Sequence, residues 1–369
     1  MTTRIAICTH FSIEHFRGGE KWAVNLANDL VKDDSIAVSV RSLPYAPNGD
    51  RKVVAEDVLD EAVPYVEAWR HDLAGVDAAY VMYHPGASVV NFHGADHYIA
   101  GIHSWLYVSP QLFEQHYGVI PTVTKLAYRA FGRYDLDRYD AVHSVTPVTE
   151  HIFSPSIFIP NFVDTTLFEP DRASLFDRFT AFVPAAHIDE KGWDISRAVA
   201  ARASPDISFI TTGTTDSPDI ETTGFLSERE LADLYSRSHV VLHPARVDTD
   251  SMVINEAIAS GTPVVTTPLP THVRENDAIV HASSVDEIVS VISGLASEFS
   301  TTRGAYDARS ELARTIAADR SKEKILPKLQ KLLTTVADSA EDLHPDVTER
   351  TDHRSALAST PPGHAEEKL

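Results

Sequence analysis

The sequence is poor in cysteine and in lysine. Cys8 is the one cysteine among 369 residues, so the chain can form no internal disulfide. Its place in the apolar run RIAICTH is typical of a small buried strand residue, and a reducing compartment fits. The chain has 53 acidic residues and 32 basic ones, of which ten are lysines, and its net charge is -21. This balance argues against a protein that binds nucleic acid or anionic membranes, because both need clustered basic residues.

The acidic excess also indicates the kind of surface that the protein has. High Asp and Glu content with scarce Lys and abundant Thr and Val resembles the surfaces of salt-adapted cytoplasmic proteins, whose charges are screened and hydrated. We therefore predict a halophilic source.

Long hydrophobic runs are absent as well. No stretch of about 18 apolar residues occurs, and the first residues lack a hydrophobic segment that ends in a small-residue cleavage site. We expect a cytoplasmic protein, or one that is peripheral on the inner face of the cell membrane.

Residues 125–133 form a local basic face in this acidic chain. Basic side chains recur there at i,i+4 spacing with aromatic side chains nearby, which makes the segment a candidate for peripheral membrane contact. A solvated helix paired with Asp135 and Asp137 is the alternative. The residues concerned are Lys125, Arg129 and Arg133, with Tyr128 and Phe131.

What the sequence contains is a repeated alternation of short apolar runs with amphipathic segments. RIAICTH, KWAVNLANDLVKDD and SIAVSVRSL open the chain as strand, helix and strand, and a second series follows the Pro- and Asn-bearing segment IPNFVDTTLFEP. Such alternation predicts parallel sheets that are covered on both faces. A last helix, KEKILPKLQKLLTTV, should start or kink at Pro327.

We therefore predict an α/β protein with two Rossmann-like doubly wound domains. The first spans residues 1–165 and the second residues 166–337, with the last helix able to pack back on the first domain. Residues 338–369 are too poor in apolar side chains to fold alone, and we expect a disordered tail there.

Ligands of parallel sheets bind beyond the carboxyl ends of the strands, so residues that follow the apolar runs are site candidates. Gly18 and Gly19 lie in the first such loop, where glycine allows close backbone approach and the next helix N-terminus attracts anions. A plain turn is the alternative. The pair does not form the Gly-x-Gly-x-x-Gly fingerprint, which argues against a nicotinamide dehydrogenase. His84 and His103 follow other strands of this domain, so both are candidates to line the same cleft, and His103 is preferred.

The loop AHIDEKGWD of the second domain carries Lys191 beside Gly192, before a predicted helix. A lysine in this place can supply positive charge to a diphosphate, and a solvated lysine is the alternative.

Three acids lie within HPARVDTDSMVINEAIASGTPVV, at residues 243–265. Asp250 with Ser251 is most simply a helix cap. That explanation does not require Asp248 or Glu256. We expect no metal at these acids, because no His or Cys supplies further ligands at regular spacing.

Six segments in this order resemble the retaining family 4 glycosyltransferases with the GT-B fold, from about residue 4 to about residue 335. They are the Gly-Gly-Glu of the first loop, RYDAVHSVTPVTEHIF, IPNFVDTTLF, DEKGWD, GFLSERELADLYSRSHVVLHPA, and an acid seven residues before a glutamate that leads into GTPVV.

The resemblance implies a nucleotide-sugar donor in the second domain, an acceptor site in the first, and chemistry without a required metal or other cofactor. The paired acids of the family fall on Asp248 and Glu256. By analogy, Asp248 and the backbone N–H groups of residues 249–252 face the sugar and phosphate, and Glu256 accepts hydrogen bonds from the ribose. The donor-binding set is then Gly18, Gly19, Lys191, Asp248, Thr249, Asp250, Ser251, Met252 and Glu256, and the catalytic set is His103, Lys191 and Asp248.

Two positions depart from the family pattern. Ala185 and Ala186 stand where the family usually has Gly-Arg, so the arginine that partners the lysine at the diphosphate is missing. Asp248 replaces a glutamate and is one methylene shorter. His187 and Arg246 are candidates to compensate.

The function that follows is transfer of a hexose from a nucleotide sugar to a hydroxyl of a glycan or lipid-linked acceptor, with retention and without nucleic acid as a partner. The alternatives are a non-catalytic GT-B protein that binds nucleotide or glycan, and a nucleotide-sugar epimerase. Donor conversion without an acceptor would distinguish the epimerase.

Overall fold

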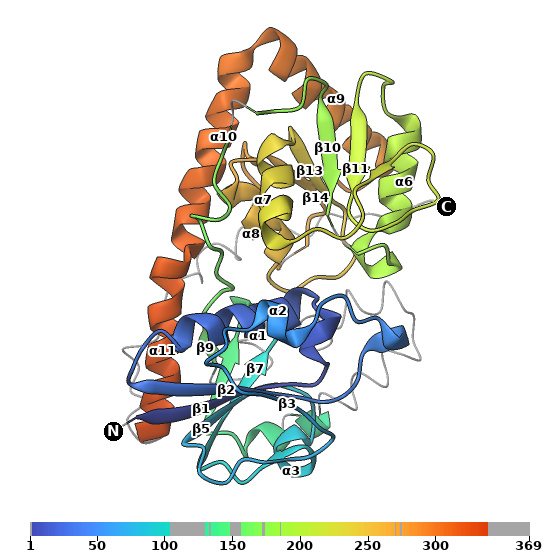
Figure 1. Cartoon of the computed structure of the whole chain (residues 1–369). Coiled ribbons are helices and arrows are strands. Elements are labelled where there is room, and N and C mark those ends of the chain that lie inside the picture. The colour runs from blue at the N-terminus through green and yellow to red at the C-terminus, as the bar shows by residue number, and fades with distance from the viewer. Residues whose placement is uncertain are drawn as a thin grey trace.

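Two parallel sheets with helices on their faces organise the chain in this computed structural model (Figure 1). The structure describes residues 2–103, 130–132, 134–147, 156–171, 174–184, 186–269, 271–273 and 275–338. The proposed basic face around Lys125, Arg129 and Arg133, Ala185, and the tail from residue 339 onward lie outside the described residues.

The first sheet contains seven described strands in the order β3-β2-β1-β5-β7-β8-β9, all parallel. The central strands are buried along most of their length, as expected where helices cover both faces. The strands are β1 (Thr3–Thr9), β2 (Ile36–Ser42), β3 (Tyr65–Glu67), β5 (Ala78–Met82), β7 (His97–Ile102), β8 (Ala141–Ser144) and β9 (Ile157–Phe158), and β4 (His71–Asp72) pairs separately with β6 (Phe92–His93).

The second sheet contains six described strands in the order β12-β11-β10-β13-β14-β15, again all parallel. In both sheets the strand order reverses beside the first strand of the domain, at β1/β5 and at β10/β13. These reversals are the switch points where doubly wound sheets bind ligands. The strands are β10 (Thr180–Val183), β11 (Ser208–Thr211), β12 (Glu221–Thr222), β13 (Val240–His243), β14 (Val264–Thr266) and β15 (Ile279–His281).

Helices pack on the faces of the two sheets. Those of the first half are α1 (Gly18–Leu30), α2 (Ala55–Val58) and α3 (Ala87–Val90), with short 3₁₀ turns η1 (Ile13–His15) and η2 (Pro47–Gly49). Those of the second half are η5 (Asp189–Lys191), α6 (Trp193–Arg202), α7 (Glu228–Arg237), α8 (Met252–Ala259), α9 (Val285–Thr301), α10 (Arg303–Ala317), η6 (Ala318–Arg320) and α11 (Lys322–Asp338).

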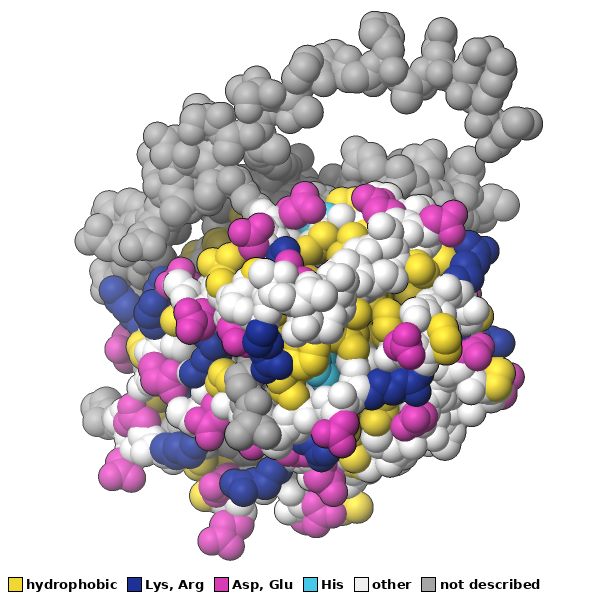
Figure 2. All heavy atoms as spheres, turned by 90° about the horizontal axis from the view of Figure 1, so that it is seen from above, with side chains coloured by type: hydrophobic (Ala, Val, Ile, Leu, Met, Phe, Trp, Pro, Cys, Tyr) yellow, Lys and Arg dark blue, Asp and Glu magenta, His cyan; other side chains and the backbone are white. Residues whose placement is uncertain are grey.

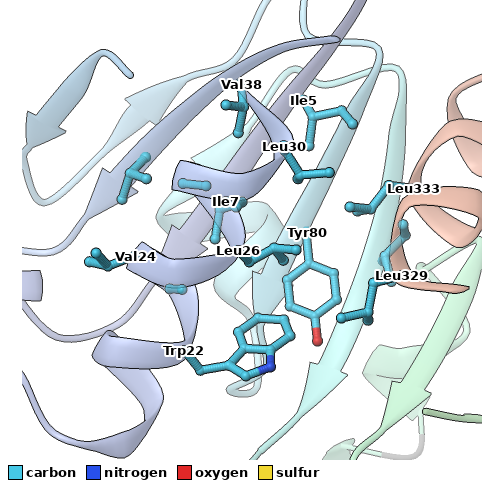
Figure 3. Close-up of a cluster of buried hydrophobic side chains, with 14 of the residues drawn as sticks. Ile5, Ile7, Trp22, Val24, Leu26, Leu30, Val38, Tyr80, Leu329 and Leu333 are labelled. Atoms are coloured by element: carbon cyan, nitrogen blue, oxygen red, sulfur yellow. The ribbon is translucent and has the colours of Figure 1, made fainter. Parts of the chain in front are cut away.

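The apolar stripe predicted for the first helix is confirmed in α1. Its members are all buried and pack on β1, β2 and β5 (Figure 3): they are Trp22, Ala23, Leu26, Ala27 and Leu30. Trp22 is the largest of them and lies beside Tyr80 of β5, with ring centroids 5.3 Å apart. The 3.6-residue spacing in the sequence therefore located the buried face of this helix.

Helix α11 packs against the first sheet although it follows the second domain in sequence. It contacts β1, β5 and β7, and Leu329 and Leu333 enter the same apolar cluster as α1 (Figure 3). The chain thus passes between the domains twice, once near Asn161 and once at α11. The helix begins at Lys322 and continues through Pro327, so the expected start at Pro327 is wrong.

Helix α10 was missed by the sequence reasoning. Its buried side chains are mostly small or polar, namely Tyr306, Ser310, Ala313 and Ala317. Only Tyr306 among them is large, so the apolar periodicity that identified α1 is weak here.

Leu329→Ala should destabilise the first domain, because Leu329 is 1% exposed and its loss leaves a cavity between α11 and the sheet. We expect the free energy of unfolding to fall by about 2–5 kcal/mol in denaturant titration. Lys328→Ala, at the exposed neighbouring position, is the control and should change it by less than about 0.5 kcal/mol. Equal effects of the two substitutions would contradict the packing of α11.

Candidate functional site

The switch point of the second sheet brings Lys191 and Asp248 together. Lys191 ends the short turn after β10, and Asp248 follows β13, the strand beside it. Lys191 Nζ lies 2.9 Å from Asp248 Oδ1. Gly192 has a φ of +69°, and a Cβ there would lie 2.0 Å from the carbonyl oxygen of Pro244. The turn therefore requires glycine, both for its backbone conformation and for its contact with the segment after β13.

The carboxylate of Asp248 is buried, and each of its two oxygens has at least one partner. Its Oδ2 accepts a hydrogen bond from His243 Nε2 at 2.8 Å, and its Oδ1 accepts one from the backbone N–H of Thr249 at 2.9 Å. Burial favours the neutral acid, but Lys191 and then His243 overcome it and hold the pKa of Asp248 well below its usual range. Asp248 is thus a stable anion that holds the ammonium of Lys191.

Two histidines adjoin this carboxylate, although the sequence showed no His or Cys at regular spacing from these acids. His243 lies five residues before Asp248, and His272 lies in the loop after β14 with its Nε2 at 3.7 Å from Asp248 Oδ2. One ligand atom from each of the three residues lies within 4.8 Å of the others. The absence of regular spacing therefore did not exclude histidine neighbours, because β13 and β14 are adjacent in the sheet.

Helix α8 (Met252–Ala259) begins directly after Asp248 and Asp250. Ser251 is its N-cap, and the Ser251 hydroxyl accepts a hydrogen bond from the backbone N–H of Ile254 at 3.3 Å. The N–H groups of the first turn of α8 that have no partner within the helix thus follow closely in sequence after Asp248, which contacts Lys191.

Asp250 does not cap the helix, contrary to the expectation. It accepts a hydrogen bond from the backbone N–H of Asn161 at 2.7 Å and pairs with Arg320. Asn161 and Arg320 lie in the two segments that pass between the domains. Burial raises the pKa of Asp250, against the opposing effect of Arg320. Asp250 therefore connects both segments that pass between the domains to the start of α8, a role that no local pattern predicted.

Gly18 and Gly19 lie where the first domain faces α8. They form the first turn of α1, not a loop before it, because the helix begins at Gly18. A Cβ on Gly18 would lie 3.8 Å from Met252 Cγ of α8, and one on Gly19 would lie 3.0 Å from Met82 Cε. The helix start that was expected to approach a donor thus faces the first residue of α8 across the domain interface.

Lys21 joins the two domains by a buried ionic contact that sequence reasoning missed. Its Nζ lies 2.7 Å from Glu256 Oε1 and 2.9 Å from Glu228 Oε1, and the residue is only 8% exposed. Burial lowers the pKa of Lys21, but Glu256 and Glu228 more than offset this and the pKa is raised. Lys21, Glu228, Met252 and Glu256 line one cavity between the domains. The scarcity of lysine and its place after Gly-Gly-Glu were the available signals.

His103 packs against α1 within the first domain. It follows β7, its ring centroid is 4.3 Å from that of Trp22, and its Nε2 lies 2.8 Å from the hydroxyl oxygen of Tyr80. Trp22 follows Lys21 in sequence, so α1 connects His103 to the Glu256 contact. No hydrogen bond or ring contact joins His103 to Lys191 or Asp248 within the described part of the chain.

His84 does not join this group. Its Nδ1 lies 2.9 Å from its neighbour's carbonyl oxygen, that of Pro85, and its ring meets His10 edge-on at 6.1 Å.

The two residues considered as replacements for the missing arginine are engaged elsewhere. Arg246 forms a bidentate pair with Asp194, at 2.6 and 2.7 Å, and also contacts Asp189. The ring of His187 stacks on Trp193 with centroids 3.8 Å apart. Ala186 therefore has no substitute among these side chains, and Lys191 is the cation that the turn after β10 supplies to the site.

Comparison with known proteins identifies the fold. Residues 197–298 match the family model described as Glycosyl transferases group 1. No curated protein matches the chain. The solved structure of HepE from Anabaena, in complex with UDP and glucose, is similar over 90% of this chain and 99% of its own, with a TM-score of 0.68 and 14% identity.

Two further solved structures agree. Sucrose-phosphate synthase from Thermosynechococcus elongatus has a TM-score of 0.68 at 14% identity, covering 90% of this chain and 99% of its own. WaaG, a glycosyltransferase involved in lipopolysaccharide biosynthesis, has a TM-score of 0.61 at 13% identity, covering 89% and 99%. The chain thus has the GT-B fold, as predicted.

Acidic and basic side chains alternate over the face seen in Figure 2, with apolar ones between them. Among the described residues, no helix is both long and apolar enough to cross a membrane.

Replacing Lys21 should weaken the contact between the domains. Lys21→Met leaves Glu228 and Glu256 as unpaired neighbouring acids, and we expect a loss of about 3–5 kcal/mol in the free energy of unfolding, measured by denaturant titration. Lys32→Met, at an exposed lysine just after the C-terminal end of α1, is the control. Adding Glu256→Gln to Lys21→Met should restore part of the loss. A change below about 0.5 kcal/mol in Lys21→Met would contradict this role.

Buried histidines should make the protein sensitive to mild acid. Burial lowers the pKa of His10, His143 and His243 to about 4 each. The unfolded chain, with histidine pKa values of about 6.5, binds more protons below that pH than the folded chain does. Stability should therefore fall as the pH drops from about 6.5 to about 4, by up to about 1.4 kcal/mol per pH unit for each histidine.

Denaturant titrations at constant salt across this pH range test the effect. His243→Gln should reduce the slope of stability against pH. A stability that rises on acidification through this range would show that these histidines are charged in the folded protein.

Proposed function

We propose that the chain is a glycosyltransferase that moves a hexose from a nucleotide sugar to a hydroxyl of a glycan or lipid-linked acceptor, with retention of anomeric configuration. The observation that carries the proposal is the grouping of Lys191, Asp248 and the α8 N-terminus at the switch point of the second sheet, opposite Gly18. The match of residues 197–298 to the group 1 family model and the UDP and glucose bound by HepE support it.

Lys191 and α8 are suited to the leaving group. When a sugar leaves a nucleotide diphosphate, negative charge develops on the phosphate oxygens, and groups already aimed at that charge lower the barrier. Lys191 supplies a positive charge that Asp248 and Gly192 hold in place, and the first turn of α8 supplies N–H groups and the positive end of its dipole.

Asp248 acts by orienting, not by attacking the sugar. Both of its oxygens are engaged, by Lys191 and by His243, so the carboxylate is a poor nucleophile. We assign it to holding Lys191 and to accepting hydrogen bonds from sugar hydroxyls through its remaining lone pair. Lys191 already balances its charge, and the reaction that we propose requires no metal.

Glu256 is the proposed ribose ligand. A buried carboxylate on α8, one turn after the helix start, accepts readily from vicinal hydroxyls. In this structure its partner is Lys21 of the first domain. We therefore expect the ribose to compete with the ammonium of Lys21 for Glu256, which couples donor binding to the contact between the domains.

A non-catalytic nucleotide-binding protein is the second candidate. The observation that favours it is the absence of the family arginine at Ala186, with Arg246 and His187 bound elsewhere. Such a protein would bind a nucleotide sugar without transferring or hydrolysing it.

Lys191→Ala and Glu256→Ala should each reduce transfer by well over tenfold, because each removes a charged contact to the donor. The donor is first chosen by a thermal-shift screen of nucleotide sugars, and turnover is then measured with the best binder. Lys324→Ala, an exposed lysine that pairs with Asp319, is the control and should leave the rate unchanged. Near-normal rates in both site variants would refute the assignment, and binding without turnover in the unmodified protein would favour the second candidate.

A further inference from the structure

Three side chains of the first sheet form a continuous hydrogen-bonded chain that the proposed function does not use. His103 Nε2 lies 2.8 Å from the hydroxyl oxygen of Tyr80, and the same oxygen lies 2.6 Å from His143 Nδ1. His143 Nε2 lies 2.8 Å from the carbonyl oxygen of Ile159. Tyr80 is 1% exposed and His143 is 0% exposed, so the chain runs through the interior.

The carbonyl at its end determines where every proton lies. A carbonyl oxygen can only accept, so His143 carries its proton on Nε2. Burial lowers the pKa of His143 to about 4, so the neutral ring has a lone pair on Nδ1. The hydroxyl of Tyr80 must then donate to His143, because burial also raises the pKa of Tyr80 and keeps it protonated.

The same logic fixes His103. The Tyr80 hydroxyl uses its hydrogen in the bond to His143, so its oxygen accepts the bond from His103. His103 therefore carries its proton on Nε2. Burial, with smaller effects from His143 and His10, lowers the pKa of His103 well below its usual range. The neutral ring is left with a lone pair on Nδ1.

Two neighbours show that this chain is built into the fold. A Cβ on Gly101 of β7 would lie 2.2 Å from the Tyr80 hydroxyl oxygen, so the ring occupies space that only glycine leaves free. Trp22 packs on His103 from α1, with centroids 4.3 Å apart, and Figure 3 shows Trp22 next to the hydroxyl end of Tyr80.

We propose that Tyr80 and His143 are positioning residues that hold His103 as the Nε2-protonated tautomer, so that its Nδ1 accepts a hydrogen bond from a hydroxyl of the substrate. The identity of the substrate in this inference rests on the proposed function. The tautomer of His103 does not depend on that function. A neutral ring with a lone pair favours a hydroxyl group and disfavours an anionic group at the same place.

The direct test is the tautomer of each histidine, read from long-range ¹⁵N–¹H NMR correlations in histidine-labelled full-length protein. His103 and His143 signals are assigned by comparison with single His103→Asn and His143→Gln variants. Both rings should carry the proton on Nε2 near neutral pH. An Nδ1-protonated or doubly protonated His103 overturns the proposal, whether or not any transferase activity is found.

The substitution Tyr80→Phe should affect the tautomer of His103 and not that of His143. Among the described residues the Tyr80 hydroxyl is the partner of His103 Nε2, so the His103 signals should move toward those of a ring in tautomeric exchange. His143 should stay Nε2-protonated on the Ile159 carbonyl. Tyr98→Phe, which removes a hydroxyl that bonds to Ala95 N–H in the same sheet, is the control and should move neither ring. An unchanged His103 spectrum in Tyr80→Phe overturns the proposal.

Activity gives the second readout. Tyr80→Phe should lower kcat about tenfold, as expected for one misplaced hydrogen bond, with donor KM changing less than about twofold. His103→Asn, whose amide oxygen can take the place of Nδ1, should retain more activity than His103→Gln, whose amide reaches the Nε2 position. Equal rates in the two His103 variants, or a normal kcat in Tyr80→Phe with its fold intact by circular dichroism, contradict the proposal.

Discussion

The buried ammonium of Lys21 sets the relation between the two halves of the molecule. It lies between Glu228 and Glu256 of the second domain while it belongs to α1 of the first, and neither carboxylate has a comparable partner described nearby. A charge removed from water in this way is stable only while its counter-charges stay within contact distance. The alignment of α1 with α8 therefore follows from this contact, and that alignment places Gly18 against Met252.

The start of helix α8 and the residues just before it connect the parts of the site. Asp248, just before the helix, contacts Lys191, and the Oγ of the cap residue Ser251 lies 3.2 Å from His243 Nε2. Asp250 contacts both segments that pass between the domains. A donor bound at the first turn of α8 would thus contact the residues that connect the domains. Binding and domain alignment share the same side chains, which is the physical basis for coupling them.

The sequence predicted the fold well because its signals were local. The buried face of α1 and the central strands of both sheets follow from the apolar pattern, whereas the short edge strands β3, β9, β12 and β15 were not predicted. The GT-B assignment follows from the order of six short segments. Prediction failed where the deciding contact is distant in sequence: Asp250 looked like a cap because Arg320 lies 70 residues away, and Lys21 was overlooked because Glu256 lies 235 residues away. Helix α10 was missed because small residues fill its buried face. Of the residues singled out, Lys191 and Asp248 lie in contact and Glu256 contacts Lys21 instead, and the roles of all three remain proposals.

The shorter acid at Asp248 is accommodated by its surroundings. The aspartate still reaches both Lys191 and His243, and the glycine at 192 brings the lysine close enough for that contact. The missing arginine at Ala186 leaves Lys191 and the α8 N-terminus as the described groups that can meet a diphosphate. The most direct test of this account is a crystal structure of the protein with the nucleotide sugar that binds best. The account predicts the diphosphate against Lys191 and the first turn of α8, with the ribose hydroxyls within hydrogen-bond distance of Glu256. A nucleotide bound away from α8, with Glu256 still paired only to Lys21, would contradict it.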